Sequence, residues 1–194
     1  MFGPDEDSLT VAIQAGGKST RMGRDKSFVP FEGQPMIEVV RDRVAALGNE
    51  LILITNNPEP YAYLNLPAYG DIYPDCGPLG GIHSALANAA SPYVLMVACD
   101  MPWLNRDLLE YLISLRKTAD IIVPRLDKFP EPLHAIYSKV CLDPIETNLK
   151  AGDLKITRFY GQVSVRFVDR EEIARFDPQG RSFTNINSPE DLPE

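Results

Sequence analysis

Cysteine, histidine and long apolar runs are all scarce in this 194-residue chain. Its three cysteines, at positions 76, 99 and 141, are an odd number, and no two have C-x-x-C spacing. A disulfide framework and a structural zinc site are therefore not expected. The two histidines, His83 and His134, are far apart and form no metal-binding pattern, so each is interpreted as a structural residue.

The chain also has no apolar stretch near the roughly 20 residues that a membrane-spanning helix needs. Residues 1–7 are acidic where a secretory signal would be basic, so we expect a cytoplasmic protein with no membrane partner. An excess of basic residues is missing too, because the formal net charge is -8. That charge argues against nucleic-acid binding. A compact site for an anionic small molecule stays open, because the field in a cleft is local.

Apolar strand patterns alternate with helical patterns along the whole chain, and no linker, repeat or low-complexity segment separates them. This order predicts one α/β domain over residues 1–194, with a mostly parallel central sheet covered on both faces. Ligands of such sheets bind at the carboxyl ends of the strands. The predicted strands are residues 9–14, 51–55, 93–98, 120–123, 135–137 and 163–168. The predicted helices are residues 36–47, 82–90 and 106–117, one that Ser138 caps and that ends before Gly152, and a last one from Ser188.

The loop after the first strand is the most informative segment. An apolar run ends at Gly16 and Gly17, and four cations follow at positions 18, 21, 24 and 26, opposed only by Asp25. Two glycines allow the backbone to approach a base or a phosphate. Arg21 can hold phosphate oxygens with its forked guanidinium, and Lys26 can do so as a point charge. The loop therefore predicts a phosphate-binding site.

Two common phosphate-binding patterns do not fit this loop. A P-loop would need a glycine five residues before Gly17, where the chain has Ala12. The dinucleotide pattern G-x-G-x-x-G fails as well, because the glycines fall at positions 16, 17 and 23.

Acidic residues follow other predicted strands. Asp100 comes directly after the strand at 93–98, and a carboxylate there needs a partner. Mg²⁺ that bridges substrate phosphates is a natural one, since it takes one or two protein carboxylates. Asp71 and Asp75 precede a Gly-Pro-Leu-Gly-Gly turn, and either carboxylate could accept a hydrogen bond from a base or ribose, although aspartate is also common in turns.

Two shorter segments carry weaker signals, Glu131-Pro-Leu and Asn185-Ile-Asn187. Alternate residues of an extended segment face the same side, so Asn185 and Asn187 could together bind a polar ligand. The same asparagines could instead form the turn before a helix that begins at Ser188.

Taken together, these segments resemble the molybdenum cofactor guanylyltransferase family, whose members have a Rossmann-like three-layer nucleotidyltransferase fold. The matching segments run in order from the first strand to the last helix, which makes the resemblance specific. They are residues 14–26 (QAGGKSTRMGRDK), Asp71 with 77–82 (GPLGGI), 99–102 (CDMP), 131–133 (EPL) and 183–192 (FTNINSPEDL).

The resemblance implies transfer of GMP from GTP to the phosphate of molybdopterin, with or without its molybdenum, and release of pyrophosphate in a Mg²⁺-dependent reaction. It assigns nucleotide contacts to the first half of the chain, about residues 8–104, and acceptor contacts to residues 105–194. Register favours Asp71 over Asp75, because Asp71 lies six residues before Gly77. Other proteins of cofactor biosynthesis, or molybdoenzymes that receive the cofactor, are possible partners. The implied GTP-binding residues are Gln14, Ala15, Gly16, Gly17, Lys26, Asn56, Asp71 and Asp100, with Asp100 on the metal. The implied catalytic residues are Lys26, Arg21 and Asp100, and the implied acceptor-binding residues are Glu131, Asn185 and Asn187.

The chain departs from the family pattern at two places. Position 14 is Gln where the family has Leu, and residues 127–130 lack the Gly-Arg often found before E-P-L. A related enzyme that uses CTP or another phosphorylated acceptor remains an alternative, as does a non-catalytic nucleotide-binding regulator. Gly16 favours guanine, because the cytidylyl relatives tend to read A-A-G there. Intact Lys26, Asp100 and Asn185 argue against a regulator.

Overall fold

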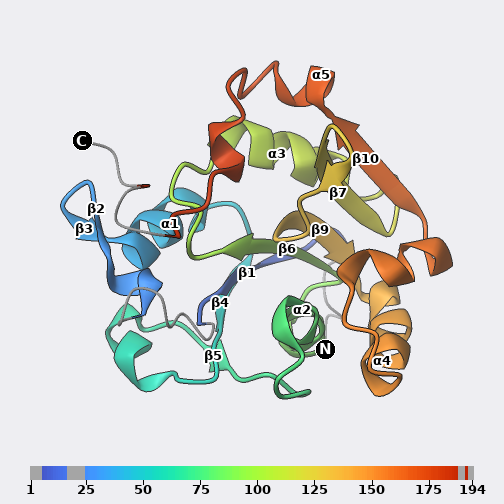
Figure 1. Ribbon diagram of the computed structural model, residues 1–194, viewed down its shortest axis with the longest axis horizontal. Coiled ribbons are helices and arrows are strands. Elements are labelled where there is room, and N and C mark those ends of the chain that lie inside the picture. The colour runs from blue at the N-terminus through green and yellow to red at the C-terminus, as the bar shows by residue number, and fades with distance from the viewer. Residues whose placement is uncertain (1–5, 17–24, 188–190, 192–194) are drawn as a thin grey trace.

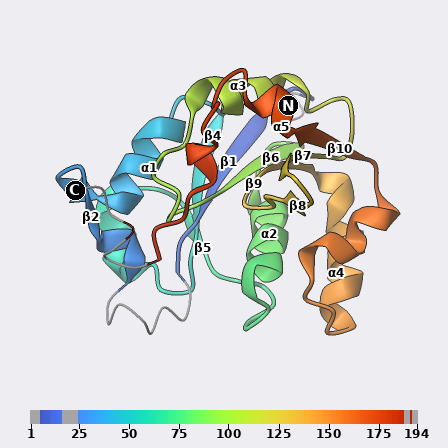
Figure 2. The same ribbon diagram turned by 45° about the horizontal axis from the view of Figure 1, so that its top comes forward.

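One large sheet crosses the protein, with helices on both of its faces (Figure 1, Figure 2). The computed structural model describes residues 6–16, 25–187 and 191. In that part of the chain the sheet has eight strands, in the order β10-β7-β9-β6-β1-β4-β5, with β8 paired to β7. A separate hairpin is formed by β2 and β3. The strands are β1 (Leu9–Gln14), β2 (Pro30–Phe31), β3 (Gln34–Pro35), β4 (Glu50–Ile54), β5 (Ala68–Tyr69), β6 (Tyr93–Ala98), β7 (Ile121–Leu126), β8 (Phe129–Pro130), β9 (His134–Ser138) and β10 (Val165–Asp169).

The helices form two layers, with α1, α3 and α5 on one face of the sheet and α2 and α4 on the other (Figure 2). Alternate residues of β1 pack against the two helical layers in turn. Val11 and Ile13 pack in the cluster that includes Ile37 of α1, while Ala12 packs in the cluster that includes Ile82 of α2. The α-helices are α1 (Met36–Val44), α2 (Gly77–Asn88), α3 (Arg106–Ser114), α4 (Leu142–Lys150) and α5 (Arg170–Ile173). The 3-10 helices are η1 (Lys26–Phe28), η2 (Glu59–Leu64), η3 (Lys139–Cys141), η4 (Ile156–Gln162) and η5 (Arg181–Phe183).

The central strands confirm the predicted parallel arrangement. Strand β1 lies between β4 and β6 and is parallel to both. Burial on both faces explains why these strands are continuously apolar. Strand β9, which the residue pattern only suggests, is antiparallel to both of its neighbours, β6 and β7. The sheet is therefore mixed but mostly parallel.

Local sequence signals predicted several elements well. Strands β1 and β6 have the predicted bounds, and Asn105 caps α3 by accepting a hydrogen bond from the amide of Leu108 at 3.0 Å. Helix α1 ends at Val44, earlier than predicted, and the chain turns before Gly48. A side chain at Gly48 would place its Cβ 2.7 Å from the carbonyl oxygen of Leu9, so glycine allows this turn to pass close to β1.

The predicted start of α2 was wrong. The helix begins at Gly77, with Pro78 in its first turn, and includes Gly80 and Gly81, which the sequence analysis assigned to a turn. Proline favours the first turn of a helix because its missing N–H would be unpaired there anyway. Ser138 precedes η3 and makes no side-chain cap. The helix predicted from Ser188 lies outside the described residues.

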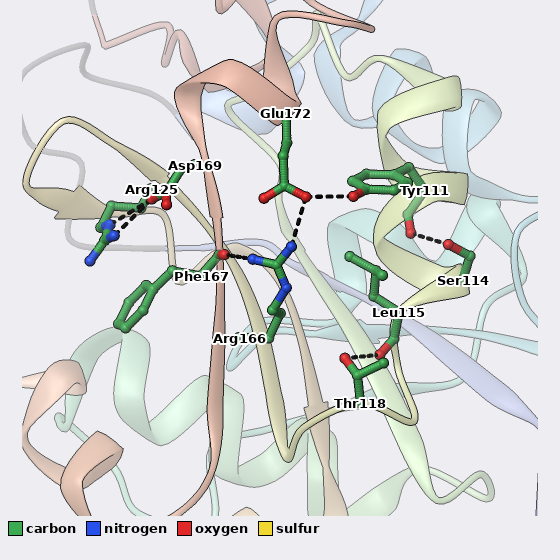
Figure 3. A network of polar contacts seen from close by, with 9 residues as sticks. All are labelled: Tyr111, Ser114, Leu115, Thr118, Arg125, Arg166, Phe167, Asp169 and Glu172. Atoms are coloured by element: carbon green, nitrogen blue, oxygen red, sulfur yellow. Dashed lines mark hydrogen bonds and ion pairs between the residues drawn. The ribbon is translucent and has the colours of Figure 1, made fainter.

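At the far edge of the sheet, polar contacts join β10 to α3 and α5 (Figure 3). The carboxylate of Glu172 accepts hydrogen bonds from the hydroxyl of Tyr111 at 2.6 Å and from the guanidinium of Arg166 at 2.7 Å. Burial opposes ionisation of Glu172, but these bonds hold its pKa below the ordinary value. Beside them, Arg125 of β7 pairs with Asp169 of β10 at 2.8 Å. These contacts hold the edge strand β10 in place, away from the loops that follow β1, β4 and β6.

No helix among the described residues is long and apolar enough to cross a bilayer.

Candidate active site

The carboxyl ends of three parallel strands meet at one edge of the sheet. Gln14, the last residue of β1, is in register with Ile54 of β4 and with Ala98 of β6. The backbone pairing continues one residue further, because Ala15 donates to Ile54 at 2.9 Å and Cys99 donates to Gln14 at 3.0 Å. The loops after β1, β4 and β6 therefore leave the sheet side by side. These are the loops that contain most of the predicted nucleotide-binding residues.

The loop after β1 begins with a glycine that its backbone requires. Gly16 has a φ of +103°, a conformation that L side chains rarely adopt, and a Cβ there would lie 3.4 Å from Oγ1 of Thr55. Gly17 and Arg21, the next predicted phosphate-binding residues, lie outside the described residues, as do Lys18 and Arg24. Their assigned roles remain predictions.

The described part of the chain resumes at Asp25, and Lys26 is the first residue of η1. Asp25 caps this short helix by accepting a hydrogen bond from the amide of Ser27 at 3.0 Å. The ammonium of Lys26 donates to Oδ1 of Asn187 at 2.7 Å. The structure therefore brings together a predicted phosphate ligand and a predicted acceptor ligand from opposite ends of the chain.

Asp100 lies two residues after the end of β6 and is half-buried. Burial raises the pKa of its carboxyl, and the positive charge of Lys26 partly offsets this effect. The carbonyl oxygen of Asp100 accepts a hydrogen bond from the amide of Ile186 at 2.9 Å. The carboxyl-terminal segment thus contacts the backbone of Asp100 and the side chain of Lys26, which closes one side of the cluster.

Asn56 and Asp71 form a reciprocal pair. The amide nitrogen of the Asn56 side chain donates to Oδ2 of Asp71 at 2.8 Å, and the backbone amide of Asp71 donates to Oδ1 of Asn56 at 2.7 Å. These contacts join the loop after β4 to the loop after β5. Asp75, the alternative to Asp71, lies four residues further on, in a turn where its own φ is +59°.

Gln14 makes a contact that the sequence analysis missed. Its side chain lies against α2, and a Cβ at Gly81 would lie 2.2 Å from Nε2 of Gln14 and 2.4 Å from Cδ. Oε1 of Gln14 is buried and has no hydrogen-bond partner among the residues that the structure describes. The Gly80-Gly81 pair was the signal in the sequence, since two glycines within a helix indicate a close approach by another group.

The predicted acceptor residues lie at the same edge of the sheet. Because β9 is antiparallel, its first residue, His134, pairs with Val97 near the carboxyl end of β6. Glu131 precedes β9, and burial raises the pKa of its carboxyl. Asn185 and Asn187 are exposed on either side of the fully buried Ile186, as expected for alternate residues of an extended segment.

A buried polar chain beneath Lys26 and Asp100 was also missed. It includes Ser27 and Cys99, which are the sequence neighbours of those two residues, and Tyr61 of η2. Only the adjacency of Ser27 and Cys99 to the predicted site was visible in the sequence. Nothing in the spacing of Tyr61 pointed to its contact with Ser27.

These observations define the protein as a nucleotidyltransferase of Rossmann-like fold, in which charged and amide side chains gather where the parallel strands end. The MobA-like NTP transferase domain model matches residues 11–166, and the chain belongs to that family.

Named relatives agree with this assignment. The chain is 38% identical over 186 residues to a Clostridium perfringens protein named "Probable molybdenum cofactor guanylyltransferase", with 92% of this chain and 91% of that protein covered. It is 35% identical over 185 residues to a "Molybdenum cofactor guanylyltransferase" of Syntrophotalea carbinolica, with 94% and 88% covered. Among solved structures, molybdopterin-guanine dinucleotide biosynthesis protein A from Archaeoglobus fulgidus superposes with a TM-score of 0.82 at 28% identity, covering 94% of each chain.

Proposed function

We propose that this protein transfers GMP from GTP to the phosphate of molybdopterin, forming the guanine dinucleotide cofactor and pyrophosphate. One observation carries the proposal. Lys26, Asp100 and the Asn56–Asp71 pair lie on neighbouring loops at the carboxyl edge of the sheet in a member of this family. Such an edge is where nucleotides bind in open α/β sheets.

The chemistry follows from the charges of the reactants. An oxygen of the acceptor phosphate attacks the α-phosphorus of GTP in line, forming a new P–O–P bond. The bond between the α-phosphorus and the bridging oxygen to the β-phosphorus breaks, and that oxygen leaves with pyrophosphate. The nucleophile is already an anion, so the step needs no general base. Rate enhancement then depends on positioning and on neutralisation of charge.

Lys26 and Arg21 would stabilise the charge that develops on the leaving pyrophosphate. Asp100 would hold Mg²⁺, which supplies charge neutralisation at the nucleotide phosphates when bound. A half-buried carboxylate at the end of a strand suits this ion, because Mg²⁺ takes one or two protein carboxylates and obtains its other oxygens from substrate and water.

The base and ribose would lie between the loop after β1 and the Asn56–Asp71 pair. Ala15, Gly16 and Gly17 would offer backbone groups to guanine. Gln14 would line the guanine beside them, with its side chain lying against Gly81 of α2.

The acceptor would approach from the other side, where Glu131, Asn185 and Asn187 lie. We propose that residues of about 8–104 bind the nucleotide and that residues 105–194 bind the acceptor within one domain. The Lys26–Asn187 hydrogen bond supports a direct junction of the two parts, at the place where transfer would occur.

The proposal is tested by measuring pyrophosphate release from ATP, GTP, CTP and UTP with Mg²⁺, with and without molybdopterin. We expect release that needs GTP and the acceptor together. Release with CTP would point to a cytidylyltransferase. GTP binding without any acceptor-dependent release would contradict the proposal and support a nucleotide-binding regulator.

A further inference from the structure

Four side chains, of which three are buried, form a chain of polar contacts next to Lys26 and Asp100 in the sequence. Oη of Tyr61 lies 2.6 Å from Oδ2 of Asp25 and 2.9 Å from Oγ of Ser27. Oγ of Ser27 lies 3.2 Å from Sγ of Cys99. Asp25 closes the arrangement, because its Oδ1 accepts from the backbone amide of Ser27. The contacts join three loops, those that follow β1, β4 and β6.

Burial makes this chain rigid. The exposed fraction is 0% for Ser27, 2% for Tyr61 and 8% for Cys99. Polar groups in a site of low dielectric hold their partners firmly, since a broken contact cannot be replaced by water. The ring of Phe28 packs on Tyr61 with centroids 4.9 Å apart, which fixes the phenol further.

Burial also keeps Tyr61 protonated. Burial, together with the hydrogen bond to Asp25, raises the pKa of Tyr61, so its hydroxyl remains a donor at all working pH values. Cys99 takes part in this chain through the contact of its Sγ with Oγ of Ser27.

The position of this chain in the sequence gives it a function. Lys26 lies between Asp25 and Ser27, and Asp100 follows Cys99, so both neighbours of Lys26 and one neighbour of Asp100 are anchored. The two loops also meet at the carboxyl-terminal segment, because Lys26 donates to Asn187 and the carbonyl oxygen of Asp100 accepts from the amide of Ile186. A shift of either loop would change the separation of these two charges.

We infer that Tyr61 is a positioning residue, which acts through Asp25 and Ser27 to hold Lys26 at a set distance from Asp100 for the departing pyrophosphate. The inference rests on the proposed function. Tyr61 itself is buried and touches neither reactant. Its effect is on geometry, and a displacement of about 1 Å far from the reacting bond can cost on the order of 100-fold in rate.

The test is Tyr61→Phe, which removes only the hydroxyl and keeps the ring against Phe28. We expect kcat to fall by about 10-fold while KM for GTP changes less than about 2-fold, because charge on the leaving group develops in the transition state. Tyr63→Phe is the matched control. It lies on the same helix η2 with half of its side chain exposed, and the pKa of Tyr63 is raised by burial and by Glu38 of α1, away from this chain.

A second measurement separates positioning from general stability. In a Lys26→Ala background, Tyr61→Phe should cause no further loss of rate, because the hydroxyl acts through Lys26. A multiplicative loss in the double variant would overturn the inference, as would an unchanged kcat in Tyr61→Phe. If Tyr61→Phe does not fold, Ser27→Ala breaks the same chain and is measured in the same two backgrounds.

Failure of the proposed function can be distinguished from failure of this inference, because measurements on the wild-type protein are sufficient to detect it. If wild-type protein released no pyrophosphate with GTP and molybdopterin, the same variants would be compared by equilibrium dialysis of inorganic pyrophosphate with Mg²⁺, because pyrophosphate carries the charge that Lys26 is proposed to hold. The inference then predicts weaker pyrophosphate binding in Tyr61→Phe than in Tyr63→Phe, and no added effect in the Lys26→Ala background. Equal binding of pyrophosphate by Tyr61→Phe and Tyr63→Phe would overturn it.

Discussion

Lys26 and Asn187 are 161 positions apart, yet Nζ of Lys26 lies 2.7 Å from Oδ1 of Asn187. The residue before Asn187, Ile186, explains how the contact is held. Its side chain is fully buried among Val29, Phe31 and Met36, and its amide donates to the carbonyl of Asp100. The carboxyl-terminal segment is therefore held against the loops that carry Lys26 and Asp100, and its Asn187 orients the ammonium of Lys26.

Replacement of Lys26 by alanine should lower the rate of pyrophosphate release by on the order of 100-fold, because a charge aimed at the leaving group is lost. The measurement is the initial rate with GTP, Mg²⁺ and molybdopterin. Lys155→Ala, on the exposed segment before η4, is the control and should keep the wild-type rate. A Lys26→Ala enzyme with near-normal turnover would refute the assignment.

Asp100→Asn should also reduce the rate by about 100-fold, because the neutral amide no longer offers a carboxylate to Mg²⁺. The same change should raise the unfolding temperature at pH 7. Burial raises the folded pKa of Asp100 above its unfolded value, so the stability that this carboxyl contributes is present at low pH and is lost as the pH rises through the folded pKa. Asparagine removes that cost.

Thermal unfolding and turnover of Asp100→Asn are measured together, with Asp107→Asn in the first turn of α3 as the control. The control should keep full activity. An Asp100→Asn protein that is less stable than wild type at pH 7 would contradict the role of burial described above.

Gly81→Ala should destabilise the protein by about 1–3 kcal/mol, because overpacking displaces a neighbouring group. The new Cβ would lie 2.2 Å from Nε2 of Gln14, so that side chain must move. Denaturant unfolding measures the effect. Gly161→Ala is the control, because a Cβ there would meet nothing within 4 Å.

The cause can be tested by a second substitution. Gln14→Ala in the Gly81→Ala protein should restore most of the lost stability, since it removes the group that the new methyl contacts. Failure of this rescue would show that the helix, and not Gln14, limits position 81.

The buried His134 should make the protein less stable in mild acid. Burial lowers the pKa of this imidazole from 6.5 to about 4, and Asp177 opposes the shift only in part. Between these values the unfolded chain binds a proton that the folded protein does not, so stability is lost as the pH falls from about 6.5 to about 4. The full effect is roughly 3 kcal/mol.

Denaturant unfolding at several pH values between 4 and 7 measures this loss. His134→Leu should flatten the dependence, since it removes the titrating group while keeping an apolar side chain against Phe183. An unchanged slope in the variant would assign the acid sensitivity to other residues.

Much of the fold could be predicted because its signals are local. The apolar runs that became β1 and β6 have the predicted ends, and Asn105 caps α3 as its residue type suggests. The start of α2 was misplaced because Gly80 and Gly81 have low helix propensity. Glycine at position 81 is explained by a contact with Gln14, a partner that the local sequence could not identify.

The candidate site also has residues that the sequence identified and residues that it did not. Asn56 and Asp71 were assigned to one site, and the structure places them in direct contact. Tyr61 was missed, because its contacts depend on three loops that converge only after β1, β4 and β6 have paired.

Local patterns in the sequence were enough to locate the central strands and most of the α-helices, and to identify the charged residues that follow the strands, because hydrophobic period and capping act over a few residues. The reversed direction of β9, the contact of Asn187 with Lys26 and the contact of Ser27 with Cys99 arise from the tertiary structure alone. Those relationships depend on how the whole chain buries its apolar surface, and residues far apart in sequence become neighbours only when the two helical layers close on the sheet.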